Sequence, residues 1–385
     1  MPASRLEHIT RIGVEDMGEL ADRLASPDLL RLENLDTDLR PPESALSATR
    51  AAIDDDDANS YLPFLGLDST RRAATALVSR HSGVDYDWRT QSLISAGGLS
   101  GILNVLLATI DPGDEVLLTD PVYVGLVNRV RLAGGVPRFV PLVPSARGWR
   151  LDRAALEAID PGPVKAALLM SPSMPTGAVL DRDEWSLLAA FCLRADCWLI
   201  DDTAMERLLF DDRPLIHPAS FPDMADRVVT VGSASKEYRM IGWRVGWVVG
   251  PTALIADVAR VSLSNVVCQT GIAMEAVARA IDDPDDGIEA AVATWQERRD
   301  LLIAELGELV AAPPHGGWSL LLDTGSLGLS GAEASERLMR AGLAATAMEN
   351  WGSAGSARYL RLVFSNEPVE RLRGVGLRIR QALGA

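Results

Sequence analysis

The feature that most constrains the fold is a series of short apolar segments separated by stretches with helical periodicity. The clearest are VKAALLMS, CWLIDD, RVVTVGS and WRVGWVVG, at 164–171, 197–202, 227–233 and 243–250. Strands that are buried on both faces read as nearly continuous apolar runs, and their alternation with helices is typical of a largely parallel sheet. We therefore predict an α/β fold.

The rest of the chain indicates two lobes, since 385 residues exceed what one core usually supports. Residues 1–45 are polar and irregular, and the acidic segment DDPDDG at 282–287 is typical of a solvated hinge. The segment 287–309 has helical periodicity and could link two lobes. We predict a large domain at 46–284 and a small domain built from 1–45 and 285–385.

Composition excludes several classes of partner. The chain has 37 basic and 53 acidic residues and a net charge of −16, which argues against a nucleic-acid or anionic membrane partner. No apolar stretch is long enough to cross a bilayer, and the N-terminus has no signal core. Three cysteines without zinc-type spacing and four scattered histidines indicate a reduced, cytoplasmic protein with no metal site.

Lysine is rare in this chain, which has only Lys165 and Lys236. Lys165 precedes an apolar strand and is expected to be solvated. Lys236 lies in VGSASKEYRMIGWRVGW, after an expected strand and a Ser-x-Ser turn. A lysine that is buried or flanked by cations has a lowered pKa and can form a Schiff base. An incidental loop lysine is the alternative, but the scarcity of lysine weakens it, and we favour Lys236 as the reactive amine.

A phosphate monoester would suit the groups around this lysine. Ser233, Ser235 and Arg244 offer two hydroxyl groups and a guanidinium fork. The segment SAGGLSG at 95–101 opens an apolar helix, and glycine frees backbone N–H groups there to bind phosphate. A Gly-rich turn alone is a weak signal, but the two features together predict a phosphate site.

Five segments, in this order, resemble the fold-type-I pyridoxal-phosphate (PLP) enzymes, specifically the class I/II aminotransferases related to aspartate aminotransferase. They are YLPFLGLDSTR (61–71), AGGLSG (96–101), DPGDEVLLTDPVY (111–123), SASKEYRMIGWRVGW (233–247) and RYLRLVFS (358–365). The resemblance implies a large domain with a mostly parallel seven-stranded sheet between helices and a smaller α/β domain from both termini.

The resemblance also implies how the cofactor is bound. Lys236 would hold PLP as a Schiff base and later shuttle the Cα proton, and Tyr123 would stack on the pyridine ring. Asp202 would pair with the pyridinium nitrogen, preferred over Asp201 because DDTAMERL fits the family's Asp-Glu-x-Tyr-Glu-Arg-Leu in that register. The phosphate would be bound by Gly98, Leu99, Ser233, Ser235, Arg244 and, from a partner subunit of a homodimer, Tyr61.

The substrate side of the site is also implied. Arg361 would clamp the α-carboxylate with two parallel hydrogen bonds. Asn34 or Leu35 stands where the family often has glycine, and Trp318 departs from the family's aromatic pattern, so these residues are expected to contact substrate. Taken singly, each assignment has a plain alternative: a packing tyrosine, an aspartate that caps a helix, or an exposed strand arginine.

Two methionines depart from the family pattern. Met174, in SPSMPTG, stands where the family has asparagine, and Met205 stands where it has tyrosine; the other register would place Ala204 there. Both family residues converge on the phenolic oxygen O3′ of PLP. A hydrogen bond to a charged acceptor contributes about 1.5–3 kcal/mol. Without these two donors the anionic O3′ is less stable, so the imine is expected to keep its proton to a higher pH.

The resemblance leaves three functions open. The first is an aminotransferase that acts on a small α-amino acid through an external aldimine and quinonoid and passes the amino group to a 2-oxo acid. The second is a relative of the same fold in a natural-product pathway, catalysing β- or γ-elimination (a C–S lyase), decarboxylation coupled to oxidative deamination, or cyclisation. The third is a non-catalytic PLP-binding regulator, against which the four residues Lys236, Asp202, Arg244 and Arg361 argue.

Overall fold

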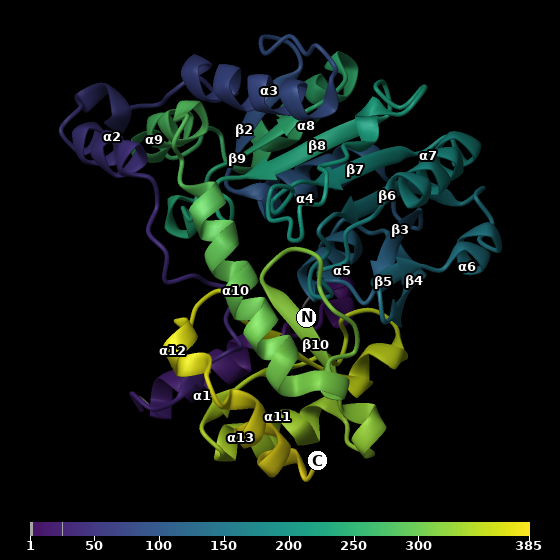
Figure 1. Cartoon of the computed structure of the whole chain (residues 1–385). Coiled ribbons are helices and arrows are strands. Elements are labelled where there is room, and N and C mark those ends of the chain that lie inside the picture. The colour runs from purple at the N-terminus through teal and green to yellow at the C-terminus, as the bar shows by residue number, and fades with distance from the viewer. Residues whose placement is uncertain (1–2, 25) are drawn as a thin grey trace.

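The computed structural model describes residues 3–24 and 26–385. Within them, one sheet has eight strands in the order β2-β9-β8-β7-β6-β3-β4-β5 (Figure 1). In sheet order these span Ser92–Ser95, Gly246–Val249, Val228–Ser233, Trp198–Asp202, Val164–Met170, Glu115–Asp120, Val136–Ser145 and Gly148–Leu151. The neighbours from β8 to β4 pair in parallel, and β2–β9, β9–β8 and β4–β5 are antiparallel.

The mostly parallel α/β sheet is confirmed, with one strand more than the seven expected. The additional strand is β5, which turns back on β4 in a hairpin. Residues of β4 alternate between partly buried and exposed over its first half, so this hairpin lacks the continuous apolar signal of the central strands.

Helices cover both faces of the sheet. One layer holds α4 (Gly98–Thr109), α5 (Val124–Leu132) and α8 (Thr252–Asn265), and the other holds α3 (Asp68–Ser82), α7 (Arg182–Ala195) and α9 (Gly271–Asp282). Side chains alternate along β7 between the two layers: Ile200 packs in the cluster with α4 and α5, and Leu199 packs in the cluster with α7. This alternation decides which side of the sheet each following aspartate faces.

Segments from both ends of the chain form the lower part of the molecule (Figure 1). Strand β1 (Leu30–Arg31) pairs with β11 (Leu343–Ala344), and β10, β13 and β12 (Ser319–Asp323, Tyr359–Val363 and Thr346–Ala347) form a second small sheet. Helix α10 (Ile288–Leu306) runs between the upper and lower parts. The remaining α-helices are α1 (Val14–Leu24), α2 (Glu43–Ile53), α6 (Arg153–Glu157), α11 (Gly331–Arg340), α12 (Val369–Leu372) and α13 (Val375–Leu383).

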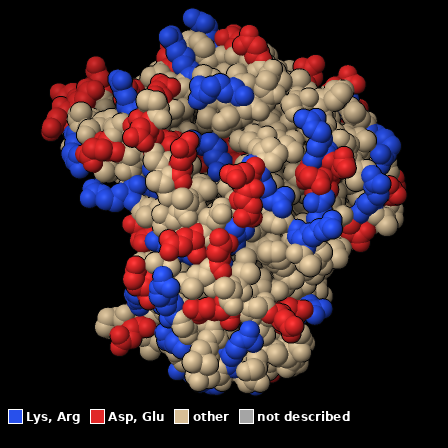
Figure 2. Space-filling model, viewed as in Figure 1, with Lys and Arg blue, Asp and Glu red and all other residues tan. Residues whose placement is uncertain are grey.

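The domain boundaries after residues 45 and 284 stay a prediction. Every strand of the eight-stranded sheet lies between them in sequence, and every strand of the two smaller sheets lies outside them. On the surface, acidic side chains lie on both parts of the molecule with basic side chains among them (Figure 2). Among the residues described, none of the helices combines the length and apolar character that a membrane span needs.

An ion pair joins α10 to the N-terminal segment. The guanidinium of Arg298, which is 4% exposed, donates to both Asp38 carboxylate oxygens at 2.8 and 2.9 Å. The same group donates to the Ser365 carbonyl at 2.8 Å. One buried cation therefore connects three segments that are far apart in sequence.

We predict that Asp38→Asn lowers the free energy of unfolding by about 1–3 kcal/mol, because it leaves a buried guanidinium without its anion. Urea unfolding followed by circular dichroism measures the change. The control is Glu43→Gln, which removes an exposed ion pair with Arg50 and should change little. Equal effects of the two substitutions would contradict a special role for the buried pair.

Candidate functional site

A cavity of about 320 Å³ opens at the carboxyl ends of β6, β7 and β8, where ligands bind in α/β sheets. The N-terminal segment and the loop after β1 close it from the other side. Thirteen of the residues that the sequence assigns to the site line it: Asn34, Leu35, Gly98, Leu99, Tyr123, Met174, Asp202, Met205, Ser233, Ser235, Lys236, Arg244 and Arg361. Tyr61 and Trp318 do not.

Lys236 enters the cavity from the turn after β8. Its ammonium group donates to the Leu35 carbonyl at 2.7 Å and lies 4.8 Å from the centre of the Trp318 ring. Desolvation is the main cause that lowers the pKa of Lys236 to about 7; Asp36 opposes the shift, and Arg361 and Arg244 contribute to it. Lys165, in contrast, is exposed on β6, so only one of the two lysines is placed for chemistry.

The start of α4 forms an anion cradle together with the turn after β8. The first hydrogen bond of this helix runs from Gly101 N–H to the Gly97 carbonyl, which leaves the N–H groups of Gly98 and Leu99 without helical partners. Gly97 has φ +84°, and a Cβ there would come within 2.7 Å of the Arg244 guanidinium. Only glycine therefore allows this close approach.

Two hydroxyl groups complete the cradle. Ser233 Oγ donates to Ser235 Oγ at 3.0 Å, and Arg244 Nη1 donates to Ser235 Oγ at 3.2 Å. Free N–H groups at a helix start, hydroxyl groups and a guanidinium suit a phosphate monoester.

The two aspartates at the end of β7 face opposite sides of the sheet. Asp202 shares the side of Ile200 and lines the cavity, whereas Asp201 shares the side of Leu199 and lies 3.5 Å from His217 Nε2. Burial raises the pKa of Asp202 to about 6. The Ala204 N–H, which donates to this carboxylate at 3.1 Å, and the charge of Arg129 both act to lower it. The structure thus places Asp202, and not Asp201, in the cavity.

Arg361 is a buried cation on β13, with 1% of its surface exposed. It donates to the Glu33 carbonyl and, at 3.3 Å, to Thr346 Oγ1, while its Nη1 meets only the Met174 sulfur at 3.9 Å. Nε has no hydrogen-bond partner, and no carboxylate pairs with the guanidinium within residues 3–24 and 26–385. Desolvation lowers the pKa of Arg361 to about 10. A buried, unpaired cation of this kind favours an anionic ligand.

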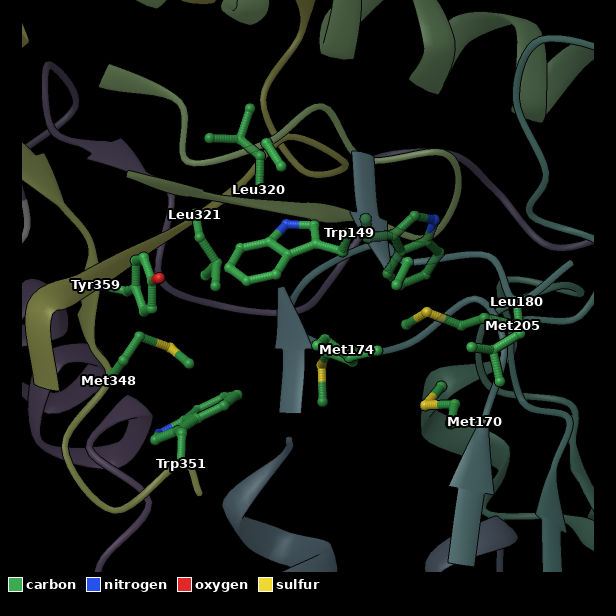
Figure 3. Packing of buried hydrophobic residues seen from close by; sticks show 14 of the residues in the cluster. Trp149, Met170, Met174, Leu180, Met205, Leu320, Leu321, Met348, Trp351 and Tyr359 are labelled. Atoms are coloured by element: carbon green, nitrogen blue, oxygen red, sulfur yellow. The ribbon is translucent and has the colours of Figure 1, made fainter. Parts of the chain in front are cut away.

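Thioether side chains form one wall of the cavity. Met174 lies between Trp351 and Met348 on one side and Met170 and Met205 on the other (Figure 3). The Met174 carbonyl accepts the Tyr123 N–H at 3.0 Å, which ties the SPSMPTG loop to the start of α5. These sulfurs accept hydrogen bonds only weakly and donate none.

Tyr61 and Trp318, the two assigned residues that do not line the cavity, lie at the surface and in the core respectively. Tyr61 is 84% exposed on the surface. Trp318 is 1% exposed and packs edge-on against Trp295, with ring centres 5.1 Å apart. Its other neighbour is the Lys236 ammonium, so it contacts the lysine rather than the cavity space.

Several wall residues escaped the sequence analysis. They are Ile12, Val14, Glu15, Met170 and Ile241, whereas Ala204, which also lines the cavity, was named only for the alternative register. The first three belong to the polar N-terminal segment, which carries no local signal of a site. Arg129, which donates from Nε to the Leu99 carbonyl at 2.8 Å, was also missed. Among the parts of the chain with described structure, no three His, Cys, Asp or Glu side chains gather as metal ligands would.

Known proteins with similar sequences are aminotransferases. Residues 28–373 match the family described as aminotransferase class I and II. A probable N-succinyldiaminopimelate aminotransferase of Mycobacterium tuberculosis is 36% identical over 85% of this chain and 82% of its own length. The arginine–pyruvate transaminase of Pseudomonas aeruginosa is 35% identical over 87% of this chain and 86% of its own.

Solved structures agree with the sequence relatives. The N-succinyldiaminopimelate aminotransferase of M. tuberculosis superposes with a TM-score of 0.90 at 32% identity, covering 99% of this chain and 100% of that one. The aspartate aminotransferase of Thermus thermophilus with maleate also has a TM-score of 0.90, at 27% identity, covering 99% of each chain. With a family match that spans most of its length, this chain belongs to the class I and II aminotransferases, which are PLP-dependent enzymes.

Proposed function

We propose that this enzyme moves the amino group of an α-amino acid to a 2-oxo acid, with Lys236 as the proton carrier. The observation that carries the proposal is the convergence of three buried charged groups in one cavity: the Lys236 amine, the Asp202 carboxylate and the Arg361 guanidinium. The charge of each has its own use in amino-acid chemistry on PLP.

The residues present fit PLP. The phosphate would be held by Gly98, Leu99, Ser233, Ser235 and Arg244, whose cradle a Cβ at Gly97 would obstruct. The Lys236 amine would bind the cofactor covalently, and Asp202 would keep its ring nitrogen protonated. Bound PLP withdraws electrons from the substrate Cα and so makes its proton acidic.

The chain's own groups then bind and move the proton. An amine with a pKa of about 7 can accept the Cα proton at neutral pH and return it, which is the best range for a general acid–base. Arg361, whose Nε has no hydrogen-bond partner, would hold the α-carboxylate and so orient Cα toward Lys236. Ile12, Val14 and Leu35 would exclude water from that side of the cavity.

The substrate side chain is proposed to lack a carboxylate. Apart from Lys236, Arg244 and Arg361, no cation lines the cavity in the described part of the chain, and Glu15 adds a negative charge at its wall. A second carboxylate would have no partner from this chain there. The relatives' names specify different amino acids, so they do not select one.

We predict that Lys236→Ala lowers the rate of amino transfer by about 100-fold or more and removes covalent attachment of PLP, because none of the other described residues that line the cavity carries an amine. Borohydride reduction followed by peptide mass spectrometry locates the attachment. Lys165→Ala is the matched control and should retain both properties. Attachment at Lys165 would refute the assignment.

An amino-acid panel tests the reaction type and the side chain together. We expect pyridoxamine phosphate to accumulate with neutral or basic amino acids, and much less with aspartate, because the carboxylate side chain lacks a cation. Release of ammonia and a 2-oxo acid without pyridoxamine phosphate would support elimination or another reaction of a natural-product pathway instead. A preference for aspartate would contradict the proposed substrate class.

Met174 and Met205 are proposed to face the phenolic oxygen of PLP. Asp202, the phosphate cradle and Lys236 would hold three other positions of the ring, and Met170, Met174 and Met205 line the same cavity, so this oxygen would face a thioether. Thioethers donate no hydrogen bond to it, so the protein would stabilise its anionic form weakly.

We predict that Met205→Tyr lowers the pKa of the lysine-bound cofactor by about one to two units, since a new hydrogen bond would stabilise the phenolate. Absorbance titration measures this pKa directly and needs no turnover. Met170→Leu, a change without a new donor in the same wall, is the control. An unchanged pKa in Met205→Tyr would show that the phenolic oxygen lies elsewhere.

A homodimer with shared sites is also proposed. Ile53, Tyr61 and Phe64 are 66%, 84% and 51% exposed, which is unusual for large apolar side chains that are close in sequence. Tyr61 would complete the phosphate site of a second copy. A cytoplasmic location stays a prediction from the composition.

Subunit mixing tests the shared site. Tyr61→Ala and Lys236→Ala proteins should each be impaired, and unfolding and refolding them together should restore activity, because one site of a mixed dimer receives neither change. Lys236→Ala mixed with Arg361→Ala is the control and should restore nothing, since both residues belong to the same chain's site. Failure of the first mixture to regain activity would place Tyr61 outside the partner's site.

A further inference from the structure

We infer that the Trp318 ring and the Leu35 carbonyl form a docking position for the ammonium group of Lys236, with Trp318 as a positioning residue. The geometry comes from two contacts on the same nitrogen: 2.7 Å to the carbonyl oxygen and 4.8 Å to the ring centre. Both contacts favour the charged form of the amine. The inference rests on the proposed role of Lys236 and concerns the amine when it is not bonded to the cofactor.

The ring is held in place from behind. Trp295 of α10 packs edge-on against Trp318 at an interplanar angle of 63°. Trp318 Nε1 has no hydrogen-bond partner among the residues described, so packing and the contact with Lys236 set its orientation. The Trp318 carbonyl accepts the Phe364 N–H at 3.0 Å, and Ser319 Oγ donates to the Pro175 carbonyl at 2.9 Å. The backbone on which the ring stands is therefore tied to two neighbouring segments.

The turn that carries the carbonyl is bonded to Trp295, the same residue that packs against the Trp318 ring. Leu35 lies in a tight turn in which the Asp36 N–H donates to the Asn34 carbonyl at 2.9 Å. Two residues further on, Thr37 Oγ1 accepts the Trp295 Nε1 hydrogen at 3.3 Å. Trp295 thus supports both halves of the docking position, which makes it a built feature rather than a chance contact.

Charged groups of both signs act on the protonation of Lys236. Asp36, in the turn that supplies the carbonyl, favours the ammonium; Arg361 on β13 and Arg244 after β8 disfavour it. Asp202 of β7 and Tyr123 before α5 line the same cavity, and Glu15 lies at its N-terminal wall. Burial lowers the pKa of Lys236 to about 7. A ring face and a carbonyl oxygen act in the opposite direction, because both favour the charged amine. Removing the ring's attraction should lower this pKa further.

This arrangement would serve the proton transfer. Once Lys236 has taken the Cα proton, the charge on Nζ needs a partner in a cavity from which water is excluded. The ring face and the carbonyl provide that partner without a carboxylate that could keep the proton. The ammonium then stays in one position until it returns the proton.

The scarcity of lysine makes the amine directly measurable. A chain with two lysines, labelled with ε-¹³C lysine, gives two NMR signals, and Lys165→Arg removes one of them for assignment. The enzyme is loaded with pyridoxamine phosphate, so that Lys236 is free. Titration of the remaining signal gives the pKa of Lys236. This measurement does not depend on amino-transfer activity.

We expect Trp318→Leu to lower the pKa of Lys236 by about one unit, since a desolvated cation–π contact contributes about that much. Trp318→Phe keeps an aromatic face and should lower it less. Trp149→Leu is the matched control: Trp149 is also 1% exposed and also has an unpaired Nε1, but it does not line the cavity or contact Lys236. An unchanged or raised pKa in Trp318→Leu would overturn the inference.

If Trp318→Leu folds poorly, incorporation of fluorinated tryptophan tests the effect of the ring on the pKa of Lys236 without removing the side chain. Successive fluorination weakens the negative potential of the ring face with little change of shape, so the pKa of Lys236 should fall stepwise with fluorine content. All nine tryptophans are replaced, and the same series in Trp318→Phe should show no fall. A fall that persists in Trp318→Phe, or no fall in either protein, would refute the role of this ring. If the cofactor instead proves to be attached at Lys165, the proposed function fails independently of this pKa.

Discussion

Desolvation of charged groups at one edge of the sheet is the constraint on which this site depends. Lys236, Asp202 and Arg361 all have pKa values displaced toward neutrality by burial, to about 7, 6 and 10. Placing charges in such a cavity is costly, and the fold offsets the cost with backbone carbonyls, a helix start and aromatic faces. The same low polarity strengthens every contact that a bound substrate and cofactor would make.

The small sheet and α10 supply the substrate side of this environment. Arg361 comes from β13, the Leu35 turn follows β1, and Trp295 of α10 supports the Trp318 ring beside the lysine. The large sheet supplies the cofactor side, with Asp202 and Lys236 at the ends of adjacent strands. The cavity therefore exists only where these two groups of elements meet, and Arg298 of α10 ties the N-terminal segment to the segment after β13.

The thioether wall is where this chain departs chemically from the family pattern. Methionine packs well and adapts to its surroundings, but it gives a polar atom little support. In this cavity the Met174 sulfur is also the sole hydrogen-bond acceptor for Arg361 Nη1 among the described residues. One residue therefore touches the arginine proposed to hold the substrate and is itself proposed to face the phenolic oxygen of the cofactor.

Much of the site could be predicted from local sequence. The apolar runs predicted the central strands, and the rarity of lysine together with the Ser-x-Ser turn and the later arginine singled out Lys236 and its phosphate cradle. The β4–β5 hairpin was missed because β4 alternates between exposed and partly buried residues and so carries no continuous apolar run. The N-terminal wall was missed because Ile12 and Val14 reach the cavity through contacts made at a distance, such as the Thr10 N–H donated to Asn128 Oδ1 at 3.1 Å.

The sequence by itself determined which groups the proposed chemistry draws on: a lysine amine, a glycine-rich helix start with two serines and an arginine, a carboxylate at the end of a buried strand and a strand arginine. These follow from residue types at fixed local spacing. Only the tertiary structure decided which of Asp201 and Asp202 enters the cavity, because alternate residues of a strand face opposite layers and the pattern does not say which layer holds the site. It also decided that Trp318 faces the lysine rather than the open cavity, because that position depends on α10, more than ten residues away in sequence and in direct contact in the fold.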